Sequence, residues 1–339
     1  MLPANVLRPT PATWESAYGD RAVPPGYGGR VLEVGMRLDT SGIGASIGEL
    51  QPGMRACPMH HHLFEEELFL VLEGELTVRE LRPGASAYDE YTLRAGELVA
   101  YPPGTGIAHQ SQNRSSAPVR TLCLSDARAP NEVCVYPESG KVLIRCLGAR
   151  GLGVFTPVGQ AAAPLDERFA AARAAATARG VRLLGPHERP SHVASAEGVR
   201  EIRVADGVHA RSLASAAGAT RLQLHRLRVE PGAVASPLRW HTADEELLVV
   251  LGGRPVVRQV HDGTDERVAL QPGDVVLWKA GPAVARQLLG GEEPADVIVV
   301  RTDRDDDVTV LPELGRVFVR ALGREGTVEP TGYWAGEHD

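Results

Sequence analysis

Long apolar runs are missing from this 339-residue sequence. The longest, such as residues 68–72 and 247–251, have only the length of a strand, whereas a membrane-spanning helix needs about 20 apolar residues. We therefore expect no membrane partner. The opening stretch MLPANVLRPTPATW also lacks the basic start and apolar centre of a secretory signal, which favours a cytoplasmic protein.

Positive charge and cysteine are also scarce. The formal net charge is −7, and no basic stripe interleaved with aromatic residues is present, so we expect no nucleic-acid partner. The cysteines show no CxxC spacing and are expected to be reduced thiols with a structural role. They are Cys57, Cys123, Cys134 and Cys146.

Glycine and proline are abundant, with 37 and 25 residues, and they separate short runs rich in Val, Leu and Ile. This pattern is typical of an all-β barrel or sandwich. One segment differs: residues 165–179, LDERFAAARAAATAR, are rich in alanine and have apolar residues at helical spacing. We expect a helix there that links two β domains and lies on a barrel surface.

The two halves of the chain repeat each other in order. The segment LQPGMRACPMHHHLFEEELFLVLEGE, from Leu50, aligns with VEPGAVASPLRWHTADEELLVVLGGR, from Val229. Similarly, YPESGKVLIR, from Tyr136, aligns with LPELGRVFVR, from Leu311, and these strands are expected to be equivalent and to cross to the partner barrel. The repeat predicts an N-terminal domain over residues 1–160, a helical linker over 161–185 and a C-terminal domain over 186–339.

Two ordered motifs in the first half combine the same few residue types. The first consists of Gly53, His60, His62, Glu67 and Gly74. The second consists of Gly96, Pro102, Gly104, His109 and Asn113. Together they resemble the two motifs of the cupin superfamily, apart from short insertions after Gly53 and Gly104, and the resemblance covers most of both halves.

This resemblance implies two cupin-type, jelly-roll β-barrels joined by a helical linker, in other words a bicupin. It also implies that His60, His62, Glu67 and His109 hold one divalent transition metal in the first barrel. Such a donor set suits Mn, Fe, Ni, Cu or Zn. Because side chains alternate along a strand, His60 and His62 should face inward together and His61 outward.

Other residues near the motifs are expected to play lesser parts. Glu65 and Glu66 are interpreted as a polar turn before the strand rather than as ligands. Phe69 and Val71 should share the inward face with Glu67 and either line the cavity or simply pack the core. Candidates for a proton donor or acceptor are Glu49, Tyr101, Ser111, Thr121 and Cys123.

The second half departs from the motif. Its corresponding positions are Arg239, His241, Glu246 and Arg286. Arginine stays protonated and cannot ligate a cation, so the second barrel should be free of metal. In the favoured interpretation Glu246 forms a buried ion pair with both arginines. In the other, the arginines form a pocket for a carboxylate or phosphate.

Two classes of function remain open. By analogy with the family, the first is a metal-dependent oxidoreductase of dioxygenase type that acts on a small organic acid, enediol or diketone. The alternatives are a non-catalytic metal- or small-molecule-binding bicupin, as sensor or scaffold, and a metal-dependent isomerase, lyase or decarboxylase. The expected partner is a small molecule, and a homodimer is considered.

Overall fold

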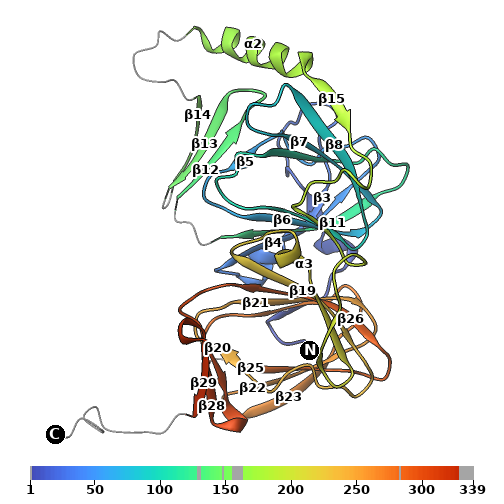
Figure 1. Cartoon of the computed structure of the whole chain (residues 1–339), viewed down its shortest axis with the longest axis vertical. Coiled ribbons are helices and arrows are strands. Elements are labelled where there is room, and N and C mark those ends of the chain that lie inside the picture. The colour runs from blue at the N-terminus through green and yellow to red at the C-terminus, as the bar shows by residue number, and fades with distance from the viewer. Residues whose placement is uncertain (1, 128–130, 147–148, 155–162, 282–283, 328–339) are drawn as a thin grey trace, which may run out of the picture.

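The structure is a computed structural model that describes residues 2–127, 131–146, 149–154, 163–281 and 284–327. Two β-barrels are stacked along the long axis of the molecule, as Figure 1 shows, with the first half of the chain forming the upper barrel. The prediction of an all-β fold of two jelly-roll barrels is therefore confirmed. The expected domain boundary near residue 160 lies outside the described residues.

The first barrel is built from three antiparallel sheets, apart from one parallel edge strand, β15. The seven-stranded sheet has the order β16 (Val193–Ser195), β9 (Glu97–Tyr101), β6 (Glu67–Glu73), β11 (Val119–Asp126), β4 (Ile43–Leu50), β3 (Arg30–Leu32) and β2 (Glu15–Ser16). The facing sheet has the order β10 (Ala108–Gln112), β7 (Glu75–Leu81), β8 (Ala87–Arg94) and β15 (Gly180–Leu183). The third has the order β14 (Ala149–Val154), β13 (Lys141–Cys146), β12 (Glu132–Tyr136) and β5 (His61–His62).

The second barrel repeats this plan. Its seven-stranded sheet has the order β1 (Val6–Leu7), β24 (Val275–Trp278), β21 (Glu246–Gly252), β26 (Ala295–Thr302), β19 (Leu222–Val229), β18 (Val208–Ser212) and β17 (Ile202–Ala205). The facing sheet contains β23 (Thr264–Ala269), β22 (Val256–His261) and β25 (Ala285–Leu289). The third contains β20 (Trp240–His241), β27 (Val308–Leu311), β28 (Arg316–Val319) and β29 (Arg324–Thr327).

Equivalent glycines end equivalent strands in the two barrels. Gly74 follows β6 and Gly253 follows β21, with φ values of +82° and +72°. A Cβ atom at either position would collide with the backbone oxygen of Pro118 or Pro294, respectively. Only glycine combines this left-handed conformation with such a close approach of the neighbouring strand.

The segments that begin at Tyr136 and Leu311 form the equivalent strands β13 and β28, which stay on their own barrels. Strand β13 pairs with β12 and β14 of the first barrel, and β28 pairs with β27 and β29 of the second. The prediction that they cross to the partner barrel is therefore wrong, because short strands within each half already offer them a hydrogen-bonding edge.

Crossing occurs instead through two other edge strands. Strand β1, near the N-terminus, pairs with β24 of the second barrel, and the N-terminus lies beside that barrel in Figure 1. Strand β16 pairs with β9 of the first barrel, although it follows the helical segment. Each barrel therefore completes its large sheet with a strand from the other half of the chain.

The alanine-rich segment forms the helix α2 (Leu165–Ala178). It lies on the first barrel, at the end remote from the second barrel, and leads into β15, which pairs with β8 (Figure 1). The Tyr88 hydroxyl donates to the carbonyl oxygen of Ala176 at 3.3 Å, and the Lys141 ammonium lies 5.5 Å from the centre of the Phe169 ring. The helix thus connects the barrels along the chain without lying between them. The remaining helices are short: α1 (Val34–Leu38), α3 (Leu213–Ala216) and the 3₁₀ turns η1 (Pro11–Thr13), η2 (Pro312–Leu314) and η3 (Arg320–Leu322).

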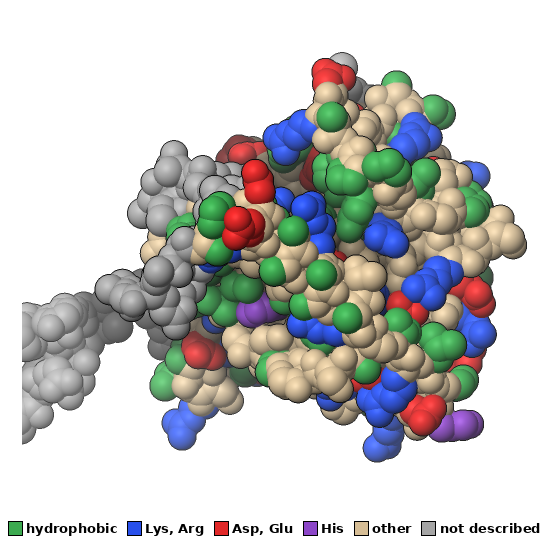
Figure 2. Space-filling view, turned by 90° about the horizontal axis from the view of Figure 1, so that it is seen from above, with side chains coloured by type: hydrophobic (Ala, Val, Ile, Leu, Met, Phe, Trp, Pro, Cys, Tyr) green, Lys and Arg blue, Asp and Glu red, His purple; other side chains and the backbone are tan. Residues whose placement is uncertain are grey.

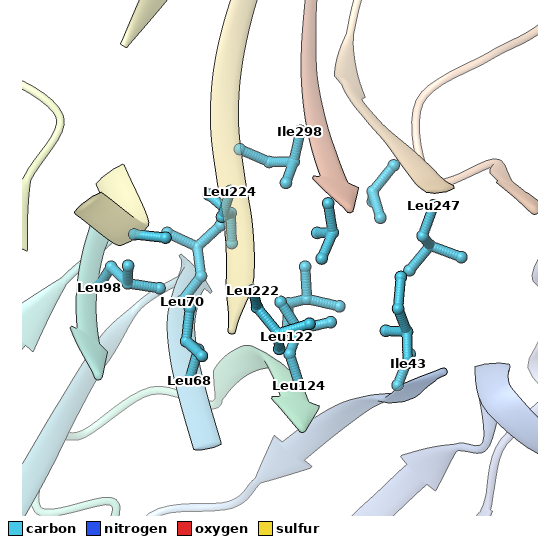
Figure 3. Close-up of a cluster of buried hydrophobic side chains, with 14 of the residues drawn as sticks. Ile43, Leu68, Leu70, Leu98, Leu122, Leu124, Leu222, Leu224, Leu247 and Ile298 are labelled. Atoms are coloured by element: carbon cyan, nitrogen blue, oxygen red, sulfur yellow. The ribbon is translucent and has the colours of Figure 1, made fainter. Parts of the chain in front are cut away.

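A shared apolar layer joins the two barrels. Leucines and isoleucines of β4, β6 and β11 face those of β19, β21 and β26, and Figure 3 shows them pointing toward one another. Leu70, Leu122, Leu224 and Ile298 are among its members, and each is at most 1% exposed. Because fully burying such a side chain is worth about 1.5–3 kcal/mol, this layer binds the barrels into one body.

The face seen from the α2 end, drawn in Figure 2, carries basic and acidic side chains interspersed with apolar and uncharged ones. The described residues form no continuous basic track on that face. Within the described part of the chain, moreover, every helix is too short or too polar to cross a bilayer.

Candidate metal centre

Three histidines converge on one carboxylate oxygen inside the first barrel. The Nε2 atoms of His60, His62 and His109 lie 3.7, 3.3 and 3.0 Å, respectively, from Oε2 of Glu67. The barrel sets this arrangement, because His62 belongs to β5, Glu67 begins β6 and His109 belongs to β10. The backbones of His60 and His109 also exchange two hydrogen bonds, of 3.1 and 2.8 Å.

The other ring nitrogen of each histidine faces an oxygen atom. Nδ1 of His60 lies 2.9 Å from the carbonyl oxygen of Pro58, and Nδ1 of His109 lies 3.4 Å from that of Ile107. Nδ1 of His62 lies 3.2 Å from a carboxylate oxygen of Glu132. A proton held on Nδ1 leaves the Nε2 lone pair of each ring free to bind a cation.

The electrostatics of the cluster favour the metal-binding protonation state at Glu67 and His109 but not at His60. Burial by itself lowers the pKa of His60, but Cys57 and Glu67 outweigh it and raise the pKa to about 10. Burial by itself raises the pKa of Glu67, but His62, His109 and His60 outweigh it and lower the pKa to about 2. Burial lowers the pKa of His109, with Glu67 acting in the opposite direction. Glu67 is therefore ionised at neutral pH, and His109 is biased toward its neutral form, the form that binds metal.

The donor set fits a transition metal. Nitrogen and carboxylate ligands bind such ions at about 2.0–2.2 Å, so neighbouring donors on one ion stand about 3 Å apart. The ligand atoms of His60, Glu67 and His109 all lie within 4.8 Å of one another, and Nε2 of His62 lies 3.3 Å from Oε2 of Glu67. Imidazole and carboxylate together suit Mn, Fe, Ni, Cu and Zn.

The neighbouring residues of the first motif have other roles. No ligand atom of His61 belongs to the described clusters that could hold a metal, consistent with its expected outward direction. Glu65 forms an ion pair with Arg145, and its carboxylate lies 3.8 Å from Nδ1 of His62. Glu66 is fully buried and turned toward the second barrel, so it is no exposed turn residue.

Strand β12 brings three residues to the centre that the motifs did not indicate. Cys134 lies within 4.8 Å of ligand atoms of His60 and His62, and the Tyr136 ring stacks on His60 with centroids 5.8 Å apart. The Glu132 carboxylate lies 3.2 Å from Nδ1 of His62 and accepts hydrogen bonds from the backbone N–H groups of Leu63 and Phe64. The repeat could have indicated Glu132, because Asp307 aligns with it in the second half. Asp307 lies 2.7 Å from Nδ1 of His241, the histidine that corresponds to His62.

The cysteines gather around this centre. Cys57, Cys123 and Cys134 are free thiols, as expected, whereas the side chain of Cys146 lies outside the described residues. The Cys57 sulfur lies 3.6 Å from Nδ1 of His60. Burial raises the pKa of the Cys123 thiol to about 12, so it remains protonated at neutral pH.

A cavity of about 150 Å³ adjoins His109. Phe69 lines it, whereas Val71 packs behind it in an apolar cluster with Val99 and Tyr101. A larger cavity, of about 520 Å³, lies at the junction of the barrels and touches none of the four candidate ligands. The smaller cavity is the chemically relevant one, because it reaches the donor cluster.

The five candidates for proton transfer separate into three groups. Ser111, Thr121 and Cys123 line the cavity. Tyr101 stacks on His109 with ring centroids 3.8 Å apart, and its hydroxyl donates to Glu80 at 2.8 Å, so it positions the ligand. Glu49 does not line the cavity; its carboxylate accepts from Nε of Arg120 at 2.9 Å.

In the second barrel the equivalent residues form an ion-pair cluster. Glu246 accepts hydrogen bonds from Nη2 of Arg239 at 3.0 Å and from Nε of Arg286 at 3.3 Å. Nε2 of His241 lies 3.9 Å from Glu246. Burial alone raises the pKa of Glu246, but Arg239 and Arg286 hold it well below its usual range. Two guanidinium groups therefore stand where the first barrel has imidazoles.

Comparison with known proteins agrees with this geometry. Residues 46–125 match the cupin domain family. Oxalate decarboxylase from Bacillus subtilis, solved at pH 4.6, is 17% identical with a TM-score of 0.55 over 86% of this chain and 76% of that one. Vicilin from Corylus avellana is 12% identical with a TM-score of 0.54 over 91% and 88%.

A further oxalate decarboxylase, from Lactobacillus farciminis in a formate complex, is 15% identical with a TM-score of 0.52 over 89% of each chain. At such identities the likeness shows the fold alone. No curated protein matches the sequence. Residues 46–125 of the first barrel thus match the cupin domain family, and the likeness over nearly the whole chain shows that the protein has the two-barrel fold of these structures.

Proposed function

We propose that the first barrel binds one divalent transition metal through His60, His62, Glu67 and His109, and that the chain is a metal-dependent oxidoreductase of dioxygenase type. The observation that carries this proposal is the convergence of three Nε2 atoms on Oε2 of Glu67. A bound metal would supply Lewis acidity and, if redox-active, electron transfer.

The cavity limits the substrate to a small molecule. A volume of about 150 Å³ corresponds to roughly five water-sized groups. That size suits a short organic acid, enediol or diketone. Phe69 and Leu76 contribute apolar walls that exclude water, while the hydroxyls of Ser111 and Thr121 can orient a polar substrate group or exchange a proton with it.

Non-catalytic binding, as in a sensor or scaffold, is the second candidate. Among the described residues that line the cavity, none is a carboxylate, and Cys123 remains a thiol. Proton transfer would therefore fall to the hydroxyl groups of Ser111 and Thr121 or to the Cys57 thiol. The lack of a carboxylate among the described lining residues also counts against an isomerase, a lyase or a decarboxylase.

Metal analysis of the purified protein, combined with an oxygen-consumption screen, tests the proposal. The screen would use short dicarboxylates, enediols and diketones. Bound metal with oxygen uptake supports the oxidoreductase, and release of carbon dioxide without oxygen uptake would point to a decarboxylase. Bound metal without turnover would leave binding as the function, and a protein that retains no metal would overturn the proposal.

We also propose that the protein is cytoplasmic, as expected from the sequence, and that it forms a homodimer. Light scattering of the purified protein would give its mass in solution. A value near the monomer mass of 36.2 kDa would contradict the dimer.

A further inference from the structure

The second barrel encloses a cavity that its ion pair does not fill. Its volume is about 290 Å³, larger than the cavity beside the candidate metal centre. Arg239 and Arg286 line it together with Glu246, and a third arginine, Arg301 of β26, joins them. Arg301 lies opposite Glu246 in the pairing of β21 with β26, so both side chains face the same side of the sheet.

Charge in this cavity is unbalanced. Three guanidinium groups line it, and Glu246 is the one carboxylate among the described lining residues. Glu246 is already engaged by Arg239 and by Nε of Arg286. Arg301 gains partial compensation outside the cavity, from Asp244 at 3.5 Å and from the Gln223 side chain at 2.5 Å. Positive charge therefore remains in excess.

Arg286 shows this excess most directly. It is only 1% exposed, and neither Nη1 nor Nη2 meets a hydrogen-bond acceptor within the described part of the chain. The Trp278 ring, 5.7 Å from its guanidinium carbon, offers only a cation–π contact. A buried guanidinium with two unused NH₂ groups is costly, and a carboxylate in the cavity would accept a hydrogen bond from each of them at once.

The rest of the lining is mostly apolar, with Ser212, His225 and Ser236 as its further polar members. Leu227, Leu248, Leu288 and Val299 form the walls, and the half-exposed Ile202 and Val204 of the edge strand β17 lie at the rim. A fully hydrated inorganic anion would leave these walls without a partner. The lining therefore favours an anion with one charged end and a compact hydrocarbon body.

We propose that the second barrel is a binding site for a small organic carboxylate, whose carboxylate accepts hydrogen bonds from Nη1 and Nη2 of Arg286 and whose apolar body packs against Leu227, Leu248 and Val299. This site is separate from the candidate metal centre and does not depend on the function proposed for it. A volume of about 290 Å³ corresponds to roughly ten water-sized groups, the size of benzoate or hexanoate.

Calorimetric titration of the metal-stripped protein tests this site, because removing metal prevents the first barrel from capturing the acid. Benzoate is the probe, benzamide is its uncharged counterpart of the same shape, and inorganic phosphate is the anion without an apolar body. We expect benzoate to bind at one site per chain, and to bind at least tenfold more tightly than benzamide or phosphate. Benzoate should also change the fluorescence of Trp278, which lines the cavity, and Trp278→Phe should abolish that change.

Arginine variants locate the site. Arg286→Lys keeps a charge but loses the two-pronged geometry, and Arg301→Gln removes a charge; each should weaken benzoate binding at least tenfold. Arg258→Gln is the control, because Arg258 pairs with Asp265 and Glu313 away from the cavity. If Arg286→Lys fails to fold, as judged by circular dichroism, Arg301→Gln decides the matter.

The outcomes separate this proposal from the one for the first barrel. Benzoate binding that persists in His60→Ala supports the second-barrel site even if the protein holds no metal. Equal binding of benzoate and benzamide would overturn the proposal, and so would stronger binding of phosphate. Undiminished binding in the folded arginine variants, or no benzoate binding by wild type, would overturn it as well.

Discussion

Glu66 and Glu245 occupy equivalent positions in the two halves, and each reaches across to bind the backbone of the other half. The Glu66 carboxylate accepts hydrogen bonds from the backbone N–H groups of residues 220–222 at 2.6–2.9 Å. The Glu245 carboxylate accepts them from residues 41–43 at 2.8–2.9 Å. Both glutamates are buried. The barrels are therefore joined by two reciprocal sets of charge-assisted hydrogen bonds as well as by the apolar layer.

Replacing either glutamate by glutamine should loosen this junction. An amide offers one acceptor oxygen in place of two and turns donors toward the backbone N–H groups, so Glu66→Gln or Glu245→Gln should cost about 2–4 kcal/mol of unfolding free energy. Urea denaturation would measure the loss. Glu73→Gln is the control, because Glu73 is an exposed residue of β6 and its loss should change stability by less than about 0.5 kcal/mol. A similar loss of stability in the control would contradict the role given to the hydrogen bonds of Glu66 and Glu245.

The metal centre predicts which of three histidine variants lose the bound metal. His60→Ala and His109→Ala should each remove most of the bound metal, because each deletes one of four donors. His61→Ala should retain it, because that ring belongs to no described donor cluster. Elemental analysis by mass spectrometry gives the metal content per chain. Equal loss in all three variants would show that the strand faces are assigned wrongly.

The two equivalent glutamates should behave oppositely toward metal. Glu246→Gln leaves Arg239 and Arg286 without their carboxylate, which should lower unfolding free energy by about 3–5 kcal/mol and leave metal content unchanged. Glu67→Gln should empty the metal site. Thermal melting and elemental analysis of both variants provide the check. A Glu246→Gln protein that loses its metal would mean that the working barrel is the second one.

Acid should destabilise the metal-stripped protein partly through Glu67. The pKa of this carboxyl is about 2 in the folded protein, below its ordinary value of 4.5, so its ionised form stabilises the fold above pH 4.5. That contribution, about 3 kcal/mol, is lost as pH falls from about 4.5 toward 2. Urea denaturation at a series of pH values should show a shallower acid dependence for Glu67→Gln than for wild type. Parallel curves would rule out this contribution.

The convergence of His60, His62, Glu67 and His109 could be anticipated because the two motifs resemble those of the cupin superfamily. Alternation along a strand added only that His60 and His62 face the same way. Helix α2 was equally accessible, since alanine-rich segments favour helix irrespective of their surroundings. The internal repeat then predicted the second barrel, because a repeated sequence is expected to repeat the fold.

What could not be anticipated depends on contacts between distant segments. From the local sequence Glu66 is interpreted as a turn residue. Its three backbone partners lie 154 to 156 positions further along the chain, so the local sequence gives no sign of them. Cys134 reaches the metal centre only because β12 folds back beside β5. Arg301 was not suspected in the second cavity, since it lies outside both motifs and faces Glu246 only through the pairing of β21 with β26.

The exchange of edge strands has a consequence for the independence of the two barrels. Once β1 serves the second barrel and β16 serves the first, deleting either half removes a strand from the half that remains. The exposed sheet edge would then invite aggregation. Each barrel therefore depends on the other for a complete sheet, so the first barrel needs the second even though two of the four ligand positions there are arginines.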